Sequence, residues 1–234
     1  MNDHPGKPLA LNAFGFDIVG FDLDGTLVDS HLDLAAALNH ALALADRPAL
    51  APAVTRTLIG GGTARMLERG LEATGGMVER AVFDRLREEL VGYYEAHIAV
   101  QTRLFPGGDT MLTGLAERGV KCAVVTNKFE RLAVRLVAAL GLSDRFYTVI
   151  GGDTLGPGRA KPAPDLLLEM RRRGGDGRAA YIGDTSFDTR AAAAAGLPCV
   201  LARFGYPDVA EDELRADVAI DHFDALIPAL ERLG

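Results

Sequence analysis

Short apolar runs rich in β-branched residues recur along this chain, and amphipathic segments separate them. The runs cover residues 16–23, 121–126, 147–151, 179–183 and 198–202, with a weaker one at 217–220. Runs this short and this apolar are typical of strands buried on both faces of a parallel sheet. Apolar residues three and four apart predict helices at residues 110–118, 130–140, 164–173 and 187–195. We therefore expect an α/β fold with a parallel sheet covered on both faces.

Residues 31–104 interrupt this alternation of strands and helices. Three helical patterns follow one another there, at residues 31–45, 64–73 and 78–98, and no strand pattern is apparent. Prolines and a run of three glycines at residues 60–62 separate them. We expect residues 31–104 to form an all-helical cap domain over one end of the sheet. Residues 1–30 and 105–234 then form the α/β core.

The charge balance of the chain limits its partners. The formal net charge is −7, and an acidic chain lacks the basic surface that a nucleic-acid backbone requires. A small phosphate ester needs only a few local cations, so that ligand class stays open. Four of the 25 basic residues are lysines, which makes a lysine in a motif more informative than an arginine. We expect a small-molecule ligand and a monomer or homodimer that binds no nucleic acid.

Compartment signals are sparse. No apolar stretch reaches the ~18 residues of a membrane span, and residues 1–12 resemble a polar, partly ordered tail rather than a secretion signal. Cys122 and Cys199 are too few for a disulfide framework, and their spacing is not that of a metal site. Each lies in an apolar run, which indicates buried thiols in a reducing compartment. We expect a cytoplasmic protein without membrane contact.

The first of four polar motifs, Asp22-Leu23-Asp24-Gly25-Thr26, follows the first predicted strand. Ligands of open parallel sheets bind at this end of the strands. Two aspartates two residues apart can point to the same side. Asp22 could attack phosphorus, and Asp24, when protonated, could donate a proton to the leaving alkoxide. Gly25 would let the chain turn sharply. A simple strand-ending turn is the alternative interpretation.

Two further motifs follow later strands. Thr126 and Asn127 offer a hydroxyl and an amide to phosphoryl oxygens, although they could instead cap the next helix. Lys161 is held in a rigid segment by Pro162 and Pro164. Its ammonium could neutralise a nucleophile and a transferring phosphoryl group. The alternative is a solvated loop lysine before a helix that begins with proline.

The fourth motif is an acidic pair, Asp184 and Asp188, one helical turn apart if a helix has begun. Hard oxygen ligands of this kind suit Mg²⁺. Acidic residues that simply stabilise a helix N-terminus are the alternative. Together the four motifs supply a nucleophile, a metal site, a charge clamp and a proton donor, which are the parts that phosphoryl transfer requires.

From about residue 16 to residue 222 the chain resembles the haloacid dehalogenase superfamily. The DxDGT motif at Asp22–Thr26, followed by Leu27-Val28-Asp29-Ser30, carries most of this resemblance. It implies a Rossmann-like core with an inserted helical cap. It also implies that Asp22 is the nucleophile and a Mg²⁺ ligand, and that Asp24 is the general acid and base with its carbonyl on the metal.

The same resemblance implies roles for the remaining motifs. Thr126 would bind the phosphoryl group and Lys161 would stabilise it. Asp184 would bind Mg²⁺ directly, and Asp188 would support the metal or its waters. Within the superfamily the chain is most similar to phosphoglycolate phosphatases, on FDLDGTLVDS, LIGGG, TNK and GDTSFDTRAAAAAG. A substrate carboxylate would need a cation, for which Arg65 is a candidate, although it could equally be a solvated arginine on a helix face.

Other functions remain open at this point. Sugar-phosphate phosphatases, pyrophosphatases and phosphomutases share most of these residues. A phosphonate hydrolase would need a cap lysine for a Schiff base, and residues 31–104 contain none. Dehalogenase chemistry would not need the general acid that Asp24 offers. A non-catalytic phosphate-binding module is the alternative from another class.

Overall fold

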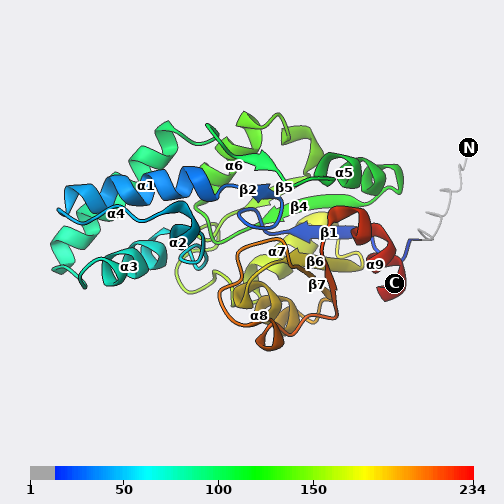
Figure 1. Ribbon diagram of the computed structural model, residues 1–234. Helices are drawn as coiled ribbons and strands as arrows, with labels where there is room; N and C mark the ends of the chain where they lie inside the picture. Colours follow the sequence, from blue (N-terminus) through cyan, green and yellow to red (C-terminus); the bar gives the residue numbers. More distant parts are fainter. Residues whose placement is uncertain (1–13) are drawn as a thin grey trace, which may run out of the picture.

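The computed structural model describes residues 14–234, and its centre is a sheet of six parallel strands (Figure 1). The strands are β1 (Ile18–Phe21), β4 (Lys121–Val125), β5 (Thr148–Ile150), β6 (Ala179–Gly183), β7 (Cys199–Ala202) and β8 (Val218–Ile220). Their order in the sheet is β5-β4-β1-β6-β7-β8. Each predicted run contains one strand, so the predicted α/β fold is confirmed. The predicted polar tail at residues 1–12 lies outside the described residues.

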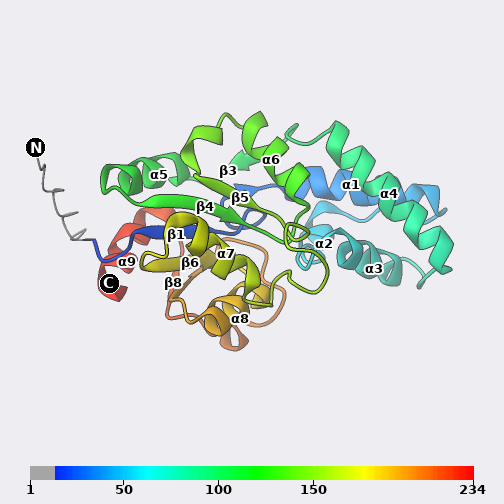
Figure 2. The same cartoon turned by 180° about the vertical axis from the view of Figure 1, so that it is seen from behind.

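Helices cover both faces of the sheet (Figures 1 and 2). One face packs against α7 (Asp165–Gly174) and α8 (Ser186–Ala195), and the other against α5 (Gly108–Glu117), α6 (Glu130–Ala139) and α9 (Leu226–Leu233). In β1, Val19 and Phe21 belong to the core cluster under α5, α6 and α9, while Ile18 belongs to the cluster under α7 and α8. This alternation is why the strand is apolar at nearly every position. Helix α9 was not predicted.

Four helices form the cap region: α1 (His31–Leu44), α2 (Pro52–Arg56), α3 (Thr63–Ala73) and α4 (Arg80–Ala96). They lie beyond the end of the sheet, on the side away from α9 and the C-terminus (Figures 1 and 2). Helix α1 packs along α4 and contacts α2 and α3. Leu38, Leu67 and Leu90 are fully buried at these contacts. The three predicted cap helices are present, and α2 is an addition.

A two-stranded antiparallel ribbon joins the cap to the core. It pairs β2 (Val28–Asp29) with β3 (Arg103–Leu104), so the chain leaves and re-enters the core side by side. The expectation of no strand within residues 31–104 is therefore wrong, because a two-residue strand has too few positions to show a pattern. Asp33 in the first turn of α1 accepts hydrogen bonds from the backbone N–H groups of Gln101 and Thr102. We propose that residues 31–104 form the cap, because the β2–β3 pairing and the Asp33 hydrogen bonds hold its two connections to the core side by side.

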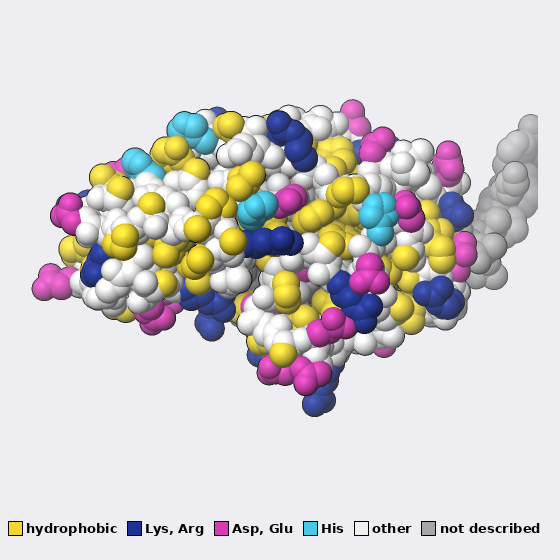
Figure 3. Space-filling model, in the orientation of Figure 1, with side chains coloured by type: hydrophobic (Ala, Val, Ile, Leu, Met, Phe, Trp, Pro, Cys, Tyr) yellow, Lys and Arg dark blue, Asp and Glu magenta, His cyan; other side chains and the backbone are white. Residues whose placement is uncertain are grey.

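Cys122 and Cys199 are buried free thiols, as predicted. Burial raises the pKa of Cys122 to about 12, which makes its thiolate scarce at neutral pH. No described helix is both long and apolar enough to cross a membrane. On the face in Figure 3, acidic and basic side chains are interspersed among apolar ones rather than gathered into a basic stripe.

Two glycines give a matched test of the packing. A Cβ on buried Gly151, after β5, would lie 2.2 Å from the backbone nitrogen of Glu130 at the start of α6. Exposed Gly92, inside α4, has no atom within 4 Å of such a Cβ. We expect Gly151→Ala to lower the free energy of unfolding by about 1–3 kcal/mol through overpacking. Gly92→Ala should raise it by about 0.5–1 kcal/mol through helix propensity. Urea unfolding measures both, and the same sign for both variants would contradict this packing.

Candidate active site

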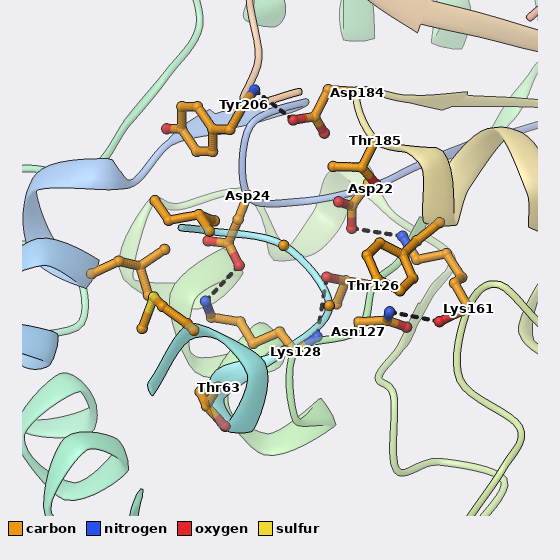
Figure 4. Close-up of a pocket in the computed structure, with 17 residues that line it drawn as sticks. Asp22, Asp24, Thr63, Thr126, Asn127, Lys128, Lys161, Asp184, Thr185 and Tyr206 are labelled. Carbon is orange, nitrogen blue, oxygen red and sulfur yellow. Dashed lines mark hydrogen bonds and ion pairs between the residues drawn. The ribbon is translucent and has the colours of Figure 1, made fainter. Parts of the chain in front are cut away.

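The four sequence motifs meet in one pocket between the carboxyl ends of the strands and the cap (Figure 4). From the core it is lined by Asp22, Asp24, Thr126, Asn127, Lys128, Lys161, Asp184, Thr185, Phe187 and Tyr206. From the cap it is lined by Leu34, Ile59, Gly60, Gly61, Gly62, Thr63 and Met66. Strands β1, β4 and β6 are neighbours in the sheet, which is why residues over 100 positions apart in the sequence converge here.

Lys161 is the central cation of the pocket and is 3 % exposed. Its Nζ lies 2.9 Å from Oδ1 of Asp22 and 2.6 Å from Oδ1 of Asp188. It also donates hydrogen bonds to the carbonyl of Val125 and the hydroxyl of Tyr181. Burial lowers the pKa of Lys161, but the two carboxylates raise it by more, so the group stays cationic. A solvated loop lysine is therefore excluded.

Asp188 fixes Lys161 while it also starts helix α8. Its Oδ2 accepts hydrogen bonds from the backbone N–H of Thr185, at 3.0 Å, and from the hydroxyl of Thr185, at 2.5 Å. The bond from the Thr185 backbone N–H is one half of a capping box at the N-terminus of α8, and in the other half the Thr185 side chain accepts from the backbone N–H of Asp188. The interpretation of Asp188 as a helix-stabilising acid is therefore correct, and it coexists with the ion pair to Lys161.

Asp184 lies against the turn that follows β1. Its Oδ1 accepts a hydrogen bond from the Thr26 hydroxyl at 2.8 Å, and its Oδ2 accepts one from the backbone N–H of Tyr206 at 2.7 Å. Gly25 has a φ of +87°, and a Cβ there would lie 2.3 Å from Asp184 Oδ2. The predicted sharp turn thus requires glycine twice, for its backbone conformation and for the close approach of Asp184.

Three buried carboxylates form a cluster that could hold a metal ion. One oxygen each from Asp22, Asp184 and Asp188 lies within 4.8 Å of the others. Burial raises the pKa of Asp22 to about 6, against the opposing effect of Lys161. Burial and the charges of Asp188 and Asp22 raise the pKa of Asp184 well above its ordinary range. A hard divalent cation fits this set, because it would neutralise carboxylates that Lys161 alone leaves in excess.

Asp24 stands apart from this cluster. Its Oδ1 accepts a hydrogen bond from the Ser30 hydroxyl at 2.6 Å, and its Oδ2 accepts one from Lys128 Nζ at 2.6 Å. Its side chain is not one of the three carboxylates that could hold a metal ion, and the expected contact of its backbone carbonyl with a metal stays a prediction. The two motif aspartates therefore have different surroundings, a prerequisite for different chemical roles.

Thr126 and Asn127 lie at the end of β4, on the floor of the pocket. Helix α6 begins at Glu130 with Phe129 as its N-cap, so neither residue caps that helix. The Asn127 side-chain amide donates a hydrogen bond to the carbonyl of Lys161 at 2.8 Å. Asn127 therefore holds the lysine segment in place while it faces the pocket.

Arg65, the predicted carboxylate ligand, lies outside the pocket lining. It is exposed near the start of α3, with its guanidinium 5.8 Å from the ring centre of Phe187. Another cap arginine, Arg56, donates hydrogen bonds to the carbonyls of Phe204 and Gly205 and lies over the ring of Tyr206. Both arginines thus bridge cap and core.

Sequence reasoning missed three residues that shape the site. Lys128 contacts Asp24, and Tyr94 of helix α4 covers Lys128. The third residue is Tyr206, whose backbone N–H donates to Asp184. The Tyr206 hydroxyl accepts hydrogen bonds from the backbone N–H groups of Ser30 and His31, where the chain enters the cap. The scarcity of lysine and the TNK motif could have identified Lys128. No sequence signal marks either tyrosine.

Comparison with known proteins shows to which family this chain belongs. The model of the haloacid dehalogenase-like hydrolases matches residues 16–196. The chain belongs to this family. It is 37 % identical over 231 residues to a phosphoglycolate phosphatase from Agrobacterium fabrum, covering 98 % of this chain and 95 % of that protein. It is 38 % identical over 219 residues to one from Mesorhizobium japonicum, covering 92 % and 96 %.

A solved structure supports the fold assignment within the haloacid dehalogenase-like hydrolases. The crystal structure of a predicted phosphoglycolate phosphatase from Haemophilus somnus superposes with a TM-score of 0.84 at 27 % identity. It covers 92 % of this chain and 98 % of that one. The core and the cap are therefore both shared with that hydrolase.

The carboxylate cluster predicts a pH-dependent effect of magnesium on stability. Because both pKa values are raised in the folded protein, protonation of Asp22 and Asp184 stabilises the fold at low pH. This stability is lost as the pH rises through the raised pKa values. Mg²⁺ binds the ionised form, so it should stabilise more at about pH 8 than at about pH 5. We expect Tm to rise by about 5–10 °C at pH 8 when Mg²⁺ is about 100 times its Kd.

Thermal melting with and without Mg²⁺ measures this effect, with Asp184→Asn as the control. The variant should lose most of the Mg²⁺-induced shift. An equal shift at both pH values, or an unchanged shift in the variant, would contradict a metal site at this cluster.

Proposed function

We propose that this hydrolase is a Mg²⁺-dependent phosphatase that cleaves a small phosphomonoester, 2-phosphoglycolate, through an aspartyl-phosphate at Asp22. The observation that carries the proposal is that Asp22, a member of the carboxylate cluster, lies 2.9 Å from Lys161, while Asp24 is held separately in the same pocket. A nucleophile, a cation and a proton carrier around one small space suit phosphoryl transfer.

In the first step, a carboxylate oxygen of Asp22 attacks phosphorus and the ester oxygen departs. Asp24 is placed to give that oxygen a proton, which makes it a better leaving group. Lys161 stays beside Asp22 and stabilises negative charge on the transferring group. The hydroxyl of Thr126, buried in the pocket, can donate a hydrogen bond to a phosphoryl oxygen.

In the second step, water hydrolyses the aspartyl-phosphate. Asp24, now deprotonated, takes a proton from the attacking water, which restores the starting state. Asp22, Asp184 and the backbone carbonyl of Asp24 would hold Mg²⁺, and Asp188 would support the metal or its waters. When bound, this ion supplies positive charge that stabilises the phosphoryl oxygens. Arg56 and Arg65 hold the cap against the core, where the cap can limit the entry of bulk water during the reaction.

Two observations support a small substrate. The relatives from Agrobacterium fabrum and Mesorhizobium japonicum are named phosphoglycolate phosphatases. In addition, the apolar side chains of Leu34, Ile59, Met66 and Phe187 line the pocket around the polar groups, and they offer no hydrogen-bond partners to the hydroxyls of a sugar ring.

The direct test is phosphate release from a panel of 2-phosphoglycolate, glucose phosphates, pyrophosphate and nucleotides, with and without Mg²⁺. We expect the highest kcat/KM for 2-phosphoglycolate, and loss of activity to background in Asp22→Asn, because the nucleophile is removed. A preference for another ester would reject the substrate but retain the mechanism. Turnover that needs a bisphosphate would favour a phosphomutase, and no release from any ester would favour a binding module.

Asp24→Asn separates the two steps. p-Nitrophenyl phosphate has a leaving group that needs little protonation, so the first step should survive in this variant, while hydrolysis slows by about 10²–10⁴-fold. We expect a burst of nitrophenol equal to the enzyme concentration, followed by slow turnover, in a stopped-flow trace. Slow release without a burst would contradict the role of Asp24 as the base of the second step.

A further inference from the structure

Lys128 is a second buried cation in the pocket, and the reaction steps above do not use it. We propose that Lys128 determines specificity: its ammonium binds a second anionic group of the substrate, a carboxylate close to the phosphate. This inference rests on the proposed phosphatase function and narrows its substrate class to phosphomonoesters that carry such a carboxylate.

The position of Lys128 suits this role. Lys128 is 7 % exposed and lines the same pocket as Asp22 and Thr126. Its ammonium lies beside Asp24, on the other side of the pocket from Lys161 (Figure 4). An ester with its phosphate between Asp22 and Lys161 would therefore extend toward Lys128 with its leaving group, which is the part that carries a carboxylate in 2-phosphoglycolate.

The ammonium of Lys128 is charged and has bonding capacity to spare. Burial lowers the pKa of Lys128, but the contacts with Asp24 and Tyr94 together raise it by more, so the net direction is upward. An ammonium has three N–H donors, and Asp24 takes one of them. The ring centre of Tyr94 lies 4.3 Å from Nζ, so the cap covers this cation and reduces its exposure to water. A charge shielded in this way binds an anion more strongly than an exposed one.

The other cations near the pocket are committed elsewhere. Lys161 is held by Asp22 and Asp188, and Arg56 by two backbone carbonyls of the core. Arg65 is exposed and stacks on Phe187. Among the described residues that line the pocket, the only cations are Lys128 and Lys161, against three aspartates. A carboxylate entering this acidic pocket would be repelled unless it met Lys128.

The experiment compares a substrate pair of similar size with and without the carboxylate, 2-phosphoglycolate and n-propyl phosphate. The variants are Lys128→Met, which keeps the length of the side chain, and Lys128→Arg, which keeps the charge. The contact with Asp24 affects both substrates, so its loss cancels in the ratio of the two kcat/KM values. We expect Lys128→Met to lower this ratio about 10- to 100-fold, mainly through KM, and Lys128→Arg to restore part of it.

Two outcomes would overturn the inference. If Lys128→Met slows both substrates equally and leaves the ratio unchanged, Lys128 only positions Asp24. If Arg65→Met lowers the ratio and Lys128→Met does not, the carboxylate binds the cap arginine. Thermal melting of each variant checks that the fold is retained.

The experiment gives a different result if 2-phosphoglycolate is not the substrate. Wild-type enzyme would then cleave n-propyl phosphate as well as 2-phosphoglycolate. In that case a second pair, 3-phosphoglycerate and glycerol 1-phosphate, gives a separate ratio for the same variants. An unchanged second ratio in Lys128→Met overturns the role of Lys128, and a lowered one supports it with a longer carboxylate ester.

Discussion

The crowding of carboxylates at one edge of the sheet is the constraint on which the rest of this site depends. Asp22, Asp184 and Asp188 are buried together, and like charges so close would oppose folding if nothing separated them. Lys161 offsets part of this repulsion through its ion pairs with Asp22 and Asp188. The negative charge that remains would attract a divalent cation. That cation and Lys161 would together stabilise a phosphoryl group during transfer. A costly arrangement for stability is thus a useful one for catalysis.

The surroundings of Asp24 follow from the same constraint. If Asp24 lay in the carboxylate cluster, it could not exchange protons independently of the metal ligands. Its contacts with Ser30 and Lys128 place it on the other side of the pocket, next to the cap. Because Tyr94 covers Lys128 from the cap, the position of the cap and the surroundings of Asp24 are physically linked. In the function that we propose, substrate selection and acid–base chemistry therefore share one region of the molecule.

Much of this fold follows from local patterns, and the missing parts follow from tertiary contacts. The six core strands were predictable because each is a short apolar run, and the motif residues were predictable because they come directly after such runs. The ribbon of β2 and β3 was not predictable, since it is a pairing of two dipeptides about 75 residues apart. Lys128 was overlooked as a site residue because its partner, Asp24, lies on another strand end, and spacing along the chain does not report such contacts. Arg65 was the opposite case, a residue that was proposed for the site from its charge and its position after the glycine run. It lies outside the pocket lining.

Chemical trapping of the phosphorylated residue shows whether Asp22 is the nucleophile. During steady-state turnover the reaction is quenched and treated with borohydride, which reduces an aspartyl-phosphate to homoserine. Peptide mass spectrometry then locates the modified position. We expect homoserine at position 22 that depends on substrate, and none at position 24 or 184. Steady phosphate release with no modified aspartate, or with the modification at another position, would contradict the assignment of Asp22 as the nucleophile.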